Sequence, residues 1–346
     1  KLGEKGWLTM SWPKEFGGQA RPPVEQLIFA EEASYHRAPV GGSIAVAIVG
    51  PVVMIYGSEE QKREYLPRIA SGDIDFCLCY SEPGAGSDLA AIQTRAMEDG
   101  DYYVISGQKI FTSLAHVVEY GWLAARTDPE APRHKGISLF IVDMKTQGIT
   151  VRPLIDMLGD HTFNEVFFDE VRIPKGCLVG EKNRGWYHMV TALDFERSPN
   201  FMFFPISSVF PVIQDLIQFA KETKRNGEPL AKDPLVRHKL AEVYTDFEVG
   251  RMLAYRIAWM LEKGLIANYE ASIAKLYATE LAQKVANVGM TILGLYGPLA
   301  PGSRWAPLRG RIERNCLFSV SATIGAGTSE IQRNIIAIRG LGLPRG

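Results

Sequence analysis

The chain has 346 residues, of which 46% are hydrophobic, enough to bury the cores of two or three domains. Its formal net charge of −1 at pH 7 argues against a general nucleic-acid binder and against a membrane-surface protein. The longest apolar stretch, residues 43–56, contains Gly and Pro and is too short to span a membrane. The four cysteines lack metal-type spacing, so we expect no metal site, and reduced thiols in a cytoplasmic protein.

The first 75 residues are predicted to be mostly helical. Residues 25–33 have apolar positions at helical spacing, and residues 44–56 form a second apolar helical stretch. Ser58, which two glutamates follow, is typical of an N-cap with an acidic first turn. Residue 1 is Lys rather than Met and no leader-like segment follows it, so we expect that the start of the chain is missing.

The pattern changes to β between Phe76 and about Gly180. The Asp99-Gly100 pair between two strand-like runs indicates a tight hairpin. Cys77 and Cys79 fall on one face of the first strand, where they cannot easily bridge each other. Strands are predicted over residues 76–80, 94–98, 102–105, 121–126, 136–144, 149–154 and 163–171.

Helical patterns return after residue 183. Asp233-Pro234 supplies a capping residue and an N1 proline for a helix over 235–261, and residues 268–293 form another long amphipathic helix. The succession of helices, strands and helices indicates an α+β protein with segregated layers and an antiparallel bundle at its end. No Gly-x-Gly-x-x-Gly pattern links a strand to a helix, which argues against a nicotinamide-dependent dehydrogenase.

Three motifs attract attention: residues 77–88 (CLCYSEPGAGSD), 107–113 (GQKIFTS) and 325–333 (GAGTSEIQR). The glycines of the first permit a ligand to approach the backbone closely and permit positive φ, and successive N–H groups there can bind an anion. Taken alone, this turn could also be an ordinary loop. In the third motif, Ser329 and Gln332 have the spacing of a capping box at the start of a helix.

In this order and separation, the three motifs resemble the acyl-CoA dehydrogenase family of FAD enzymes. The resemblance runs from about Gly3 to Pro344. It implies an α+β, acyl-CoA dehydrogenase-like fold with an N-terminal helical domain (residues 1–75), a central β-barrel-like domain (76–182) and a C-terminal four-helix bundle (183–346). Family members have further helices before a stretch like Gly6-Trp7-Leu8, so the N-terminal domain is expected to be truncated at its start.

The resemblance also implies where FAD binds. Tyr80 and Ser81 match positions at the flavin ring, and Phe111 matches an aromatic residue that packs on it. Ser113 matches a hydroxyl that bonds flavin N5, where a fixed donor stabilises the charge that develops on reduction. The plain alternatives are that Phe111 belongs to the core and that Ser113 is a strand-end hydroxyl. The other implied cofactor contacts are Gly86, Ser87, Thr328 and Glu330.

The catalytic base departs from the commonest family pattern. Many members have a glutamate just before the Gly-Thr pair, where this chain has Ala326. A minority has the base on the first long helix of the C-terminal domain, in a Leu-Asp-Leu-Glu-Arg pattern, and residues 193–197 read LDFER. Glu196 is therefore predicted to be the base, and a surface glutamate beside Arg197 is the alternative. The residues implied to bind substrate are Ser87, Asp194, Arg197, Ala326 and Gly327.

The implied reaction converts an acyl-CoA thioester to a 2-enoyl-CoA. Glu196 would remove the α-proton while the β-hydride moves to flavin N5, and the amide of Ala326 would help to polarise the thioester carbonyl. Electron-transfer flavoprotein is the expected electron acceptor. Two alternatives remain, namely an acyl-CoA oxidase-like flavoenzyme and a non-catalytic subunit of a heteromeric acyl-CoA dehydrogenase.

Two segments predict a partner subunit. In family dimers the neighbour holds the adenosine half of FAD with an Arg-x-Gln/Thr-Phe-Gly segment and a Gln-x-x-Gly-Gly segment. Here these read TKRNG (residues 223–227) and TILGL (residues 291–295), without the arginine, phenylalanine, glutamine or second glycine. We therefore expect a heterotetramer with a homologous subunit. The alternative is a homotetramer in which Arg225 replaces the missing arginine.

Overall fold

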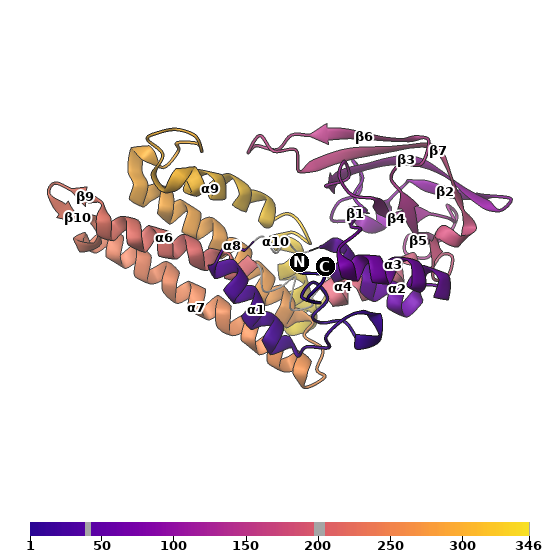
Figure 1. Ribbon diagram of the computed structural model, residues 1–346, viewed down its shortest axis with the longest axis horizontal. Helices are drawn as coiled ribbons and strands as arrows, with labels where there is room; N and C mark the ends of the chain where they lie inside the picture. The colour runs from indigo at the N-terminus through magenta and orange to yellow at the C-terminus, as the bar shows by residue number, and fades with distance from the viewer. Residues whose placement is uncertain (39–42, 197–204, 346) are drawn as a thin grey trace. The chain divides into compact units, whose positions relative to one another are not determined.

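A computed structural model describes residues 1–38, 43–196 and 205–345, with residues 191–196 described by their backbone alone (Figure 1). The chain divides into two compact units. One comprises residues 1–21 and 41–196, and the other comprises residues 22–40 and 197–346. Each unit has its own architecture and is described by itself.

The first unit begins with a 3-10 turn, η1 (Lys14–Phe16), a π-helical segment, η2 (Ala45–Val49), and two helices, α2 (Gly50–Tyr56) and α3 (Glu59–Ser71). The predicted cap at Ser58 is confirmed, because its hydroxyl accepts a hydrogen bond from the Gln61 amide and the Gln61 side chain accepts one from the Ser58 amide. The same Gln61 side chain donates to the carbonyls of Gly176 and Leu178, at 2.8 and 2.9 Å. Gln61 therefore also ties the start of α3 to residues 176–178, the segment that enters the last strand of the sheet.

An eight-stranded sheet forms the rest of the first unit, which confirms the predicted central β domain. Its order is β6-β7-β3-β2-β4-β5-β8, and β1 pairs in parallel with β4. The strands β2 and β3 form the predicted hairpin, with Asp99 opposite Tyr102 and Gly100 at φ +56°. The strands are β1 (Phe76–Cys79), β2 (Arg95–Asp99), β3 (Tyr102–Ser113), β4 (Tyr120–Arg126), β5 (Ile137–Asp143), β6 (Ile149–Leu154), β7 (Phe163–Pro174) and β8 (Leu178–Val179).

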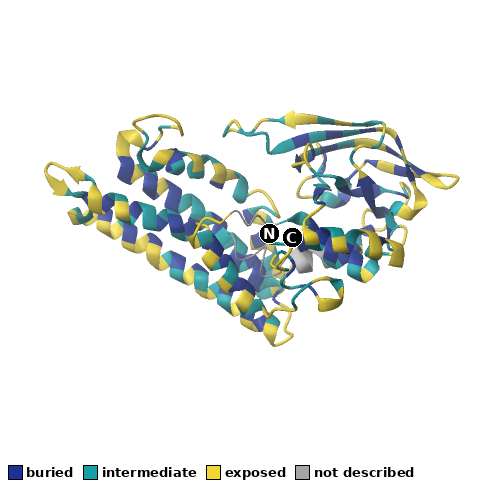
Figure 2. Ribbon diagram, viewed as in Figure 1, coloured by how far each residue is buried: buried dark blue, intermediate teal, exposed yellow. Residues whose placement is uncertain are grey.

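The core of this domain is formed by buried side chains of the strands, whose buried stretches are dark blue in Figure 2. All residues of β5 except Asp143 are buried, as expected for a strand covered on both faces. Cys77 and Cys79 are both buried and free, with their Sγ atoms 3.8 Å apart on the same face, as predicted. The sheet is followed by α4 (Gly185–Glu196), which packs on α2, η2 and β5.

The second unit is mainly helical. Four of its helices pack on one another as the predicted bundle requires, namely α6 (Val209–Glu222), α7 (Pro234–Glu262), α8 (Tyr269–Leu293) and α9 (Arg311–Ala322). The predicted cap of α7 is confirmed, because the Asp233 carboxylate accepts from the Leu235 amide at 2.8 Å. A further helix, α1, packs on α7 through the Arg251–Glu31 ion pair at 2.7 Å, so residues 22–40 group with the bundle. The helices are α1 (Pro23–Tyr35), α6 (Val209–Glu222), α7 (Pro234–Glu262), α8 (Tyr269–Leu293), α9 (Arg311–Ala322) and α10 (Ser329–Ile335).

A two-stranded hairpin, β9 (Lys224–Arg225) with β10 (Glu228–Pro229), joins α6 to α7 and was not predicted. Its turn residues Asn226 and Gly227 have φ of +53° and +87°, the conformation for which Asn-Gly pairs are preferred. Over the residues that the structure describes, no helix combines the length and apolarity needed to cross a membrane.

Candidate functional site

The glycine turn of the first motif is closed by a pair of backbone hydrogen bonds between Glu82 and Ala85, each 3.0 Å long. Neither Gly84 nor Gly86 has a positive φ, so the predicted use of these glycines for left-handed conformations is wrong. A Cβ atom at either position would meet nothing within 4 Å. The turn therefore leaves open space beside its backbone, as the close approach of a ligand requires.

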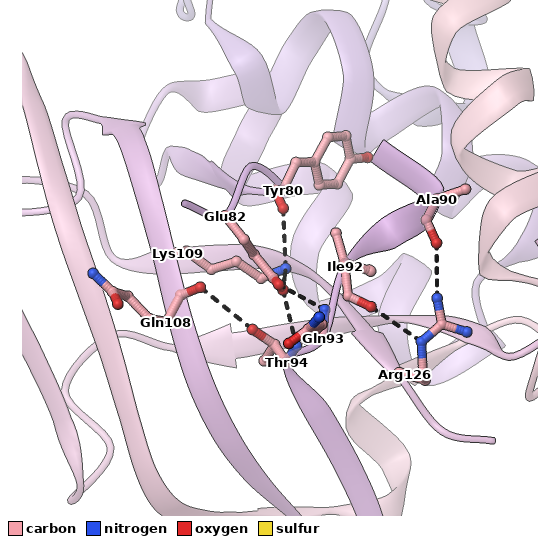
Figure 3. A network of polar contacts seen from close by, with 9 residues as sticks. All are labelled: Tyr80, Glu82, Ala90, Ile92, Gln93, Thr94, Gln108, Lys109 and Arg126. Carbon is pink, nitrogen blue, oxygen red and sulfur yellow. Dashed lines mark hydrogen bonds and ion pairs between the residues drawn. The ribbon is translucent and has the colours of Figure 1, made fainter. Parts of the chain in front are cut away.

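A buried ion pair joins this turn to strand β3 (Figure 3). The Lys109 ammonium lies 2.8 Å from a carboxylate oxygen of Glu82 and donates to the Tyr80 carbonyl at 3.0 Å. The Lys109 side chain is fully buried and Glu82 is 8% exposed. The same carboxylate accepts from the backbone amides of Gln93 and Thr94, at 2.6 and 2.9 Å. Both ends of the loop from 82 to 94 are therefore held by one side chain.

The environment acts on both charges of this pair. Burial alone would raise the pKa of Glu82, but the Lys109 charge and the donors from Lys109, Gln93 and Thr94 hold it below its ordinary value. Burial lowers the pKa of Lys109, and the neighbouring Glu82 carboxylate opposes that shift. Each partner therefore keeps the other charged in a place where an isolated charge would be costly.

Arg126 of β4 also holds the loop from 82 to 94, close to its C-terminal end. Its guanidinium donates to the carbonyls of Ala90 and Ile92, at 2.8 and 3.0 Å (Figure 3). Nearer the turn, Arg133 pairs with Asp88 at 2.7 Å in an exposed position. Ser87 is exposed beside it. The loop is thus rigid at its base and open at the predicted cofactor contacts.

The first two motifs are brought together in space. The Ile110 amide donates to the Ser81 carbonyl at 2.9 Å, and Lys109 reaches Tyr80 as described above. The Tyr80 hydroxyl in turn accepts from the indole N–H of buried Trp122, at 2.9 Å. Tyr80 and Ser81 therefore lie directly beside the β3 segment that leads to Phe111.

Phe111 is not a core residue. It is 63% exposed and has φ of +55°, a rare conformation for a bulky side chain. The cause is a bulge, since Ile110 and Phe111 of β3 lie opposite the single residue Glu165 of β7. The bulge turns an aromatic side chain outward, which excludes the core alternative. Ser113 is the half-buried last residue of β3, a place that both of its predicted interpretations require.

In the second unit, the third motif forms a fixed loop. The carbonyls of Ala326 and Gly327 accept from the Gln332 side chain at 3.1 and 3.3 Å, and the Lys275 ammonium donates to Gly327 at 2.8 Å. Ala326 and Gly327 have φ of +52° and +86°. Over the described residues their two amides find no backbone acceptor. The carbonyls are thus engaged, and the amides are the groups left for a ligand.

The predicted capping box at Ser329 is wrong by one residue. The N-cap of α10 is Thr328, whose hydroxyl accepts from the Ile331 amide at 3.3 Å. With Thr328 as the N-cap, the N3 position is Ile331, whose side chain has no acceptor, so no capping box forms; the Gln332 side chain instead donates to the loop carbonyls. Hydrogen bonds from its own backbone amide and from Thr328 lower the pKa of exposed Glu330, so this carboxylate is anchored at the helix start.

The predicted base lies at the edge of the described chain. Glu196 is the last residue of α4, and its side chain and that of Asp194 lie outside the described residues, as does Arg197. The roles of these residues stay predictions.

The two segments predicted to face a neighbouring subunit are both at the surface. Residues 224–228 are exposed in the β9–β10 hairpin. Leu295, at the position of the second family glycine, is 95% exposed. A bulky aromatic residue in place of Asn226 would be strained at φ +53°, so the departure from the family phenylalanine agrees with the hairpin geometry.

Family models match nearly the whole chain. The acyl-CoA dehydrogenase N-terminal domain matches residues 1–73, the middle domain residues 77–171 and the C-terminal domain residues 183–341. The chain belongs to the acyl-CoA dehydrogenase family. It is accordingly an FAD-dependent enzyme of the acyl-CoA dehydrogenase type.

Individual relatives cover the full length of the chain. Acyl-CoA dehydrogenase FadE26 of Mycobacterium tuberculosis is 41% identical over 356 residues, covering 100% of this chain and 87% of that protein. A solved structure described as Tcur3481-Tcur3483 steroid ACAD has a TM-score of 0.93 at 40% identity, over 100% of this chain and 88% of that one. The ChsE4-ChsE5 complex from Mycobacterium tuberculosis has a TM-score of 0.90 at 40% identity, with the same coverage.

Each unit, taken by itself, presents groups that suit a part of FAD. An outward-facing aromatic ring at Phe111, open backbone at Gly84 and Gly86, and available amides at Ala326 and Gly327 are groups that a flavin ring and a pyrophosphate can use. The residues that hold these groups in place were missed by the sequence reasoning, namely Glu82, Lys109, Arg126, Lys275 and Gln332. A charged residue inside an otherwise strand-like pattern, such as Lys109, is the signal that could have found the ion pair.

We predict that Lys109→Met lowers the free energy of unfolding by about 3–5 kcal/mol, because it leaves a buried carboxylate without its cation. The double variant Glu82→Gln/Lys109→Met should recover part of this loss, since no uncompensated charge remains. Urea denaturation measures both. Arg133→Met, which removes the exposed pair with Asp88, is the control and should cost about 0–1 kcal/mol. A Lys109→Met loss as small as the control would contradict the prediction.

The ion pair also predicts a pH dependence. Because the folded-state pKa of Glu82 is lowered, its stabilisation is present above the ordinary carboxyl pKa and is lost as the pH falls through the folded value. Removing Lys109 removes the main cause of the lowering and leaves burial to raise the Glu82 pKa, so the part of the acid loss of stability that depends on Glu82 should disappear or reverse. The stability deficit of Lys109→Met relative to the native protein should therefore be largest at neutral pH and shrink as the pH falls. Unfolding free energies measured from neutral to acidic pH test this; identical acid profiles would count against it.

Proposed function

We propose that the chain catalyses the α,β-dehydrogenation of an acyl-CoA thioester to a 2-enoyl-CoA, with Glu196 as the α-proton base. The observation that supports this most is the bulge that turns Phe111 outward beside Ser81, held by the buried Glu82–Lys109 pair. Backbone strain of this kind, with a bulky residue at positive φ, is expected where a ligand is bound. FAD supplies the hydride acceptor when bound.

The chain's own groups account for the proton chemistry. Glu196 lies in the sequence LDFER, which resembles the Leu-Asp-Leu-Glu-Arg pattern of family members whose base is on this helix, and Ala326 stands where the others have a glutamate. Over the described residues the amide of Ala326 has no backbone acceptor, so it is available to donate to the thioester oxygen. That donor would stabilise the negative charge that develops when the α-proton leaves.

The substrate is best sought among bulky acyl groups. One solved relative is described as a steroid ACAD, so a CoA thioester with a steroid-bearing acyl chain belongs in the screen beside straight-chain and branched thioesters. Anaerobic addition of each thioester to the FAD-loaded protein, followed by flavin absorbance, tests the proposal. Bleaching by at least one of them is expected; no bleaching by any acyl-CoA would overturn it.

Electron-transfer flavoprotein is the proposed electron acceptor, and rapid reoxidation of the reduced protein by oxygen would instead favour an oxidase. The cytoplasm is the proposed location.

Glu196→Gln should retain FAD and slow substrate reduction of the flavin by roughly 10²–10⁴-fold, because the general base is lost while the side-chain shape is kept. Stopped-flow absorbance under anaerobic conditions measures the rate. The matched control is Glu262→Gln, the same change at the exposed last residue of α7, which should leave the rate unaltered. Near-native reduction by Glu196→Gln would assign the base elsewhere.

Ser113→Ala should slow flavin reduction or lower the flavin reduction potential, because a hydrogen-bond donor to N5 is removed; the effect should correspond to about 2–4 kcal/mol. Ser106→Ala, on the same strand, is the control with no expected effect. The potential is measured by equilibration with a redox dye. An unchanged potential together with an unchanged rate would show that the Ser113 hydroxyl does not act on the flavin.

We also propose that the native enzyme pairs this chain with a different, homologous subunit. The segments that family members offer to a neighbour's FAD have lost their key residues at 223, 226, 291 and 295, whereas Thr328 and Glu330 are kept. Two similar solved structures are described under paired names, ChsE4-ChsE5 complex and Tcur3481-Tcur3483 steroid ACAD, which supports a pair of different subunits here. A partner that retains these residues would complete the FAD site of this chain.

Expressed alone, the chain should therefore bind less than one FAD per chain, and co-expression with such a partner should give one FAD per pair of subunits. Absorbance ratios and light scattering measure both quantities. Arg225→Ala separates the alternatives, because in a homotetramer that relies on Arg225 it would release FAD, and in the heteromer it would not. A stable, fully active homotetramer with one tightly bound FAD per chain would rule out the heteromer.

A further inference from the structure

The end of strand β3 contains two bulky residues in the left-handed region within four positions. Phe111 and Leu114 have φ of +55° and +58°, and both side chains are exposed, so packing does not force this conformation. This conformation is strained for a bulky residue and persists only where the surroundings determine the backbone. The Glu82–Lys109 pair holds the beginning of this segment. Something else must hold its end.

Asn164 of β7 does so. It lies opposite Thr112 in the ladder and its side chain is fully buried. Its amide nitrogen donates to the Thr112 carbonyl at 3.0 Å. Two residues further on, the Leu114 amide donates to the Thr162 carbonyl at 2.9 Å. The Thr112 carbonyl is therefore fixed between the two left-handed residues.

Two stacked histidines set the orientation of the Asn164 amide. His116 and His161 have ring centroids 3.7 Å apart and nearly parallel planes, at 12°. The Asn164 oxygen lies 2.7 Å from His161 Nε2, and its nitrogen lies 3.2 Å from His116 Nδ1. The Thr112 group that contacts Asn164 is the backbone carbonyl, which can only accept, so the Asn164 amide nitrogen must face it. His161 then donates from Nε2 and His116 accepts at Nδ1. A flipped amide would place oxygen against oxygen.

We propose that Asn164, oriented by His116 and His161, is a positioning residue for the Phe111–Ser113 segment of the FAD site. The proposal rests on the function proposed above for Phe111 and Ser113. Asn164 acts through the Thr112 carbonyl: it keeps the bulge in one conformation, so that the ring of Phe111 and the hydroxyl of Ser113 are presented without rearrangement. Neither histidine acts on the flavin directly.

The test compares three variants of the FAD-loaded protein. Asn164→Leu keeps the branched shape and the number of heavy atoms of the side chain and removes all three hydrogen bonds. His116→Phe keeps the stack on His161 and removes one acceptor. Thr127→Val is the matched control, because Thr127 is a buried polar residue of the same domain that bonds Ser138 and Asn183, at 2.6 and 2.5 Å.

Asn164→Leu should shift the flavin absorption band, speed hydrogen exchange at amides 110–114 and slow flavin reduction by about 10–100-fold. The substrate concentration that gives half-saturation should change little, because positioning affects the chemical step. His116→Phe should change the same three quantities in the same direction by less. Thr127→Val should lose stability without changing any of them.

An Asn164→Leu protein that loses stability as Thr127→Val does, with the native flavin spectrum and native exchange at 110–114, would overturn the proposal. If Asn164→Leu does not fold, His116→Phe decides, because its ring is exposed: an unchanged spectrum and unchanged exchange would overturn the proposal equally. Spectrum and exchange need no substrate. Failure of every acyl-CoA to reduce the native protein would therefore reject the proposed reaction without deciding the role of Asn164.

Discussion

The buried ion pair between Glu82 and Lys109 is the constraint on which the middle-domain site depends. Two charges in a protein interior stabilise a structure only when their remaining hydrogen-bonding capacity is satisfied. Here the carboxylate also accepts from the Gln93 and Thr94 amides and the ammonium donates to Tyr80, so the pair fixes one conformation of the surrounding backbone. The glycine turn, the loop behind it and the first residues of the β3 bulge all take their positions from this pair.

Strain in the site is concentrated where the structure can hold it. Phe111 adopts positive φ between two fixed points, the buried ion pair and the Asn164 amide, and Leu114 adopts it just beyond them, where its amide bonds the Thr162 carbonyl. In the second unit, Ala326 adopts positive φ where Lys275 and Gln332 bind the neighbouring carbonyls. In both units a strained stretch of exposed backbone is thus accompanied by polar side chains that bind its carbonyls, the arrangement expected where pre-organisation is needed.

Local sequence signals predicted much of this fold, and long-range pairing was the part that they could not reveal. The Asp99-Gly100 hairpin and the caps at Ser58 and Asp233 were correct because each depends on residues within a few positions. The full length of β3 was missed, because the strand continues beyond residue 105 only through bulges that its partner β7 determines. The Glu82–Lys109 pair joins residues 27 positions apart, so a lysine inside a strand-like run could indicate a buried charge but could not identify its partner. The capping residue of α10 was misassigned because the spacing of Ser329 and Gln332 fits a capping box equally well, although Thr328 caps the helix and Gln332 donates to the loop carbonyls of residues 326 and 327.

The central claim is that the segment from Phe111 to Ser113 receives the flavin and that Glu196 acts on the substrate beside it. A crystal structure of the protein with FAD and a non-reducible acyl-CoA analogue measures this directly. We expect the flavin ring against Phe111, the Ser113 hydroxyl within hydrogen-bond distance of N5, and the Glu196 carboxylate at the α-carbon of the analogue. A flavin bound away from residues 111–113, or an α-carbon that faces a different base, would contradict the account.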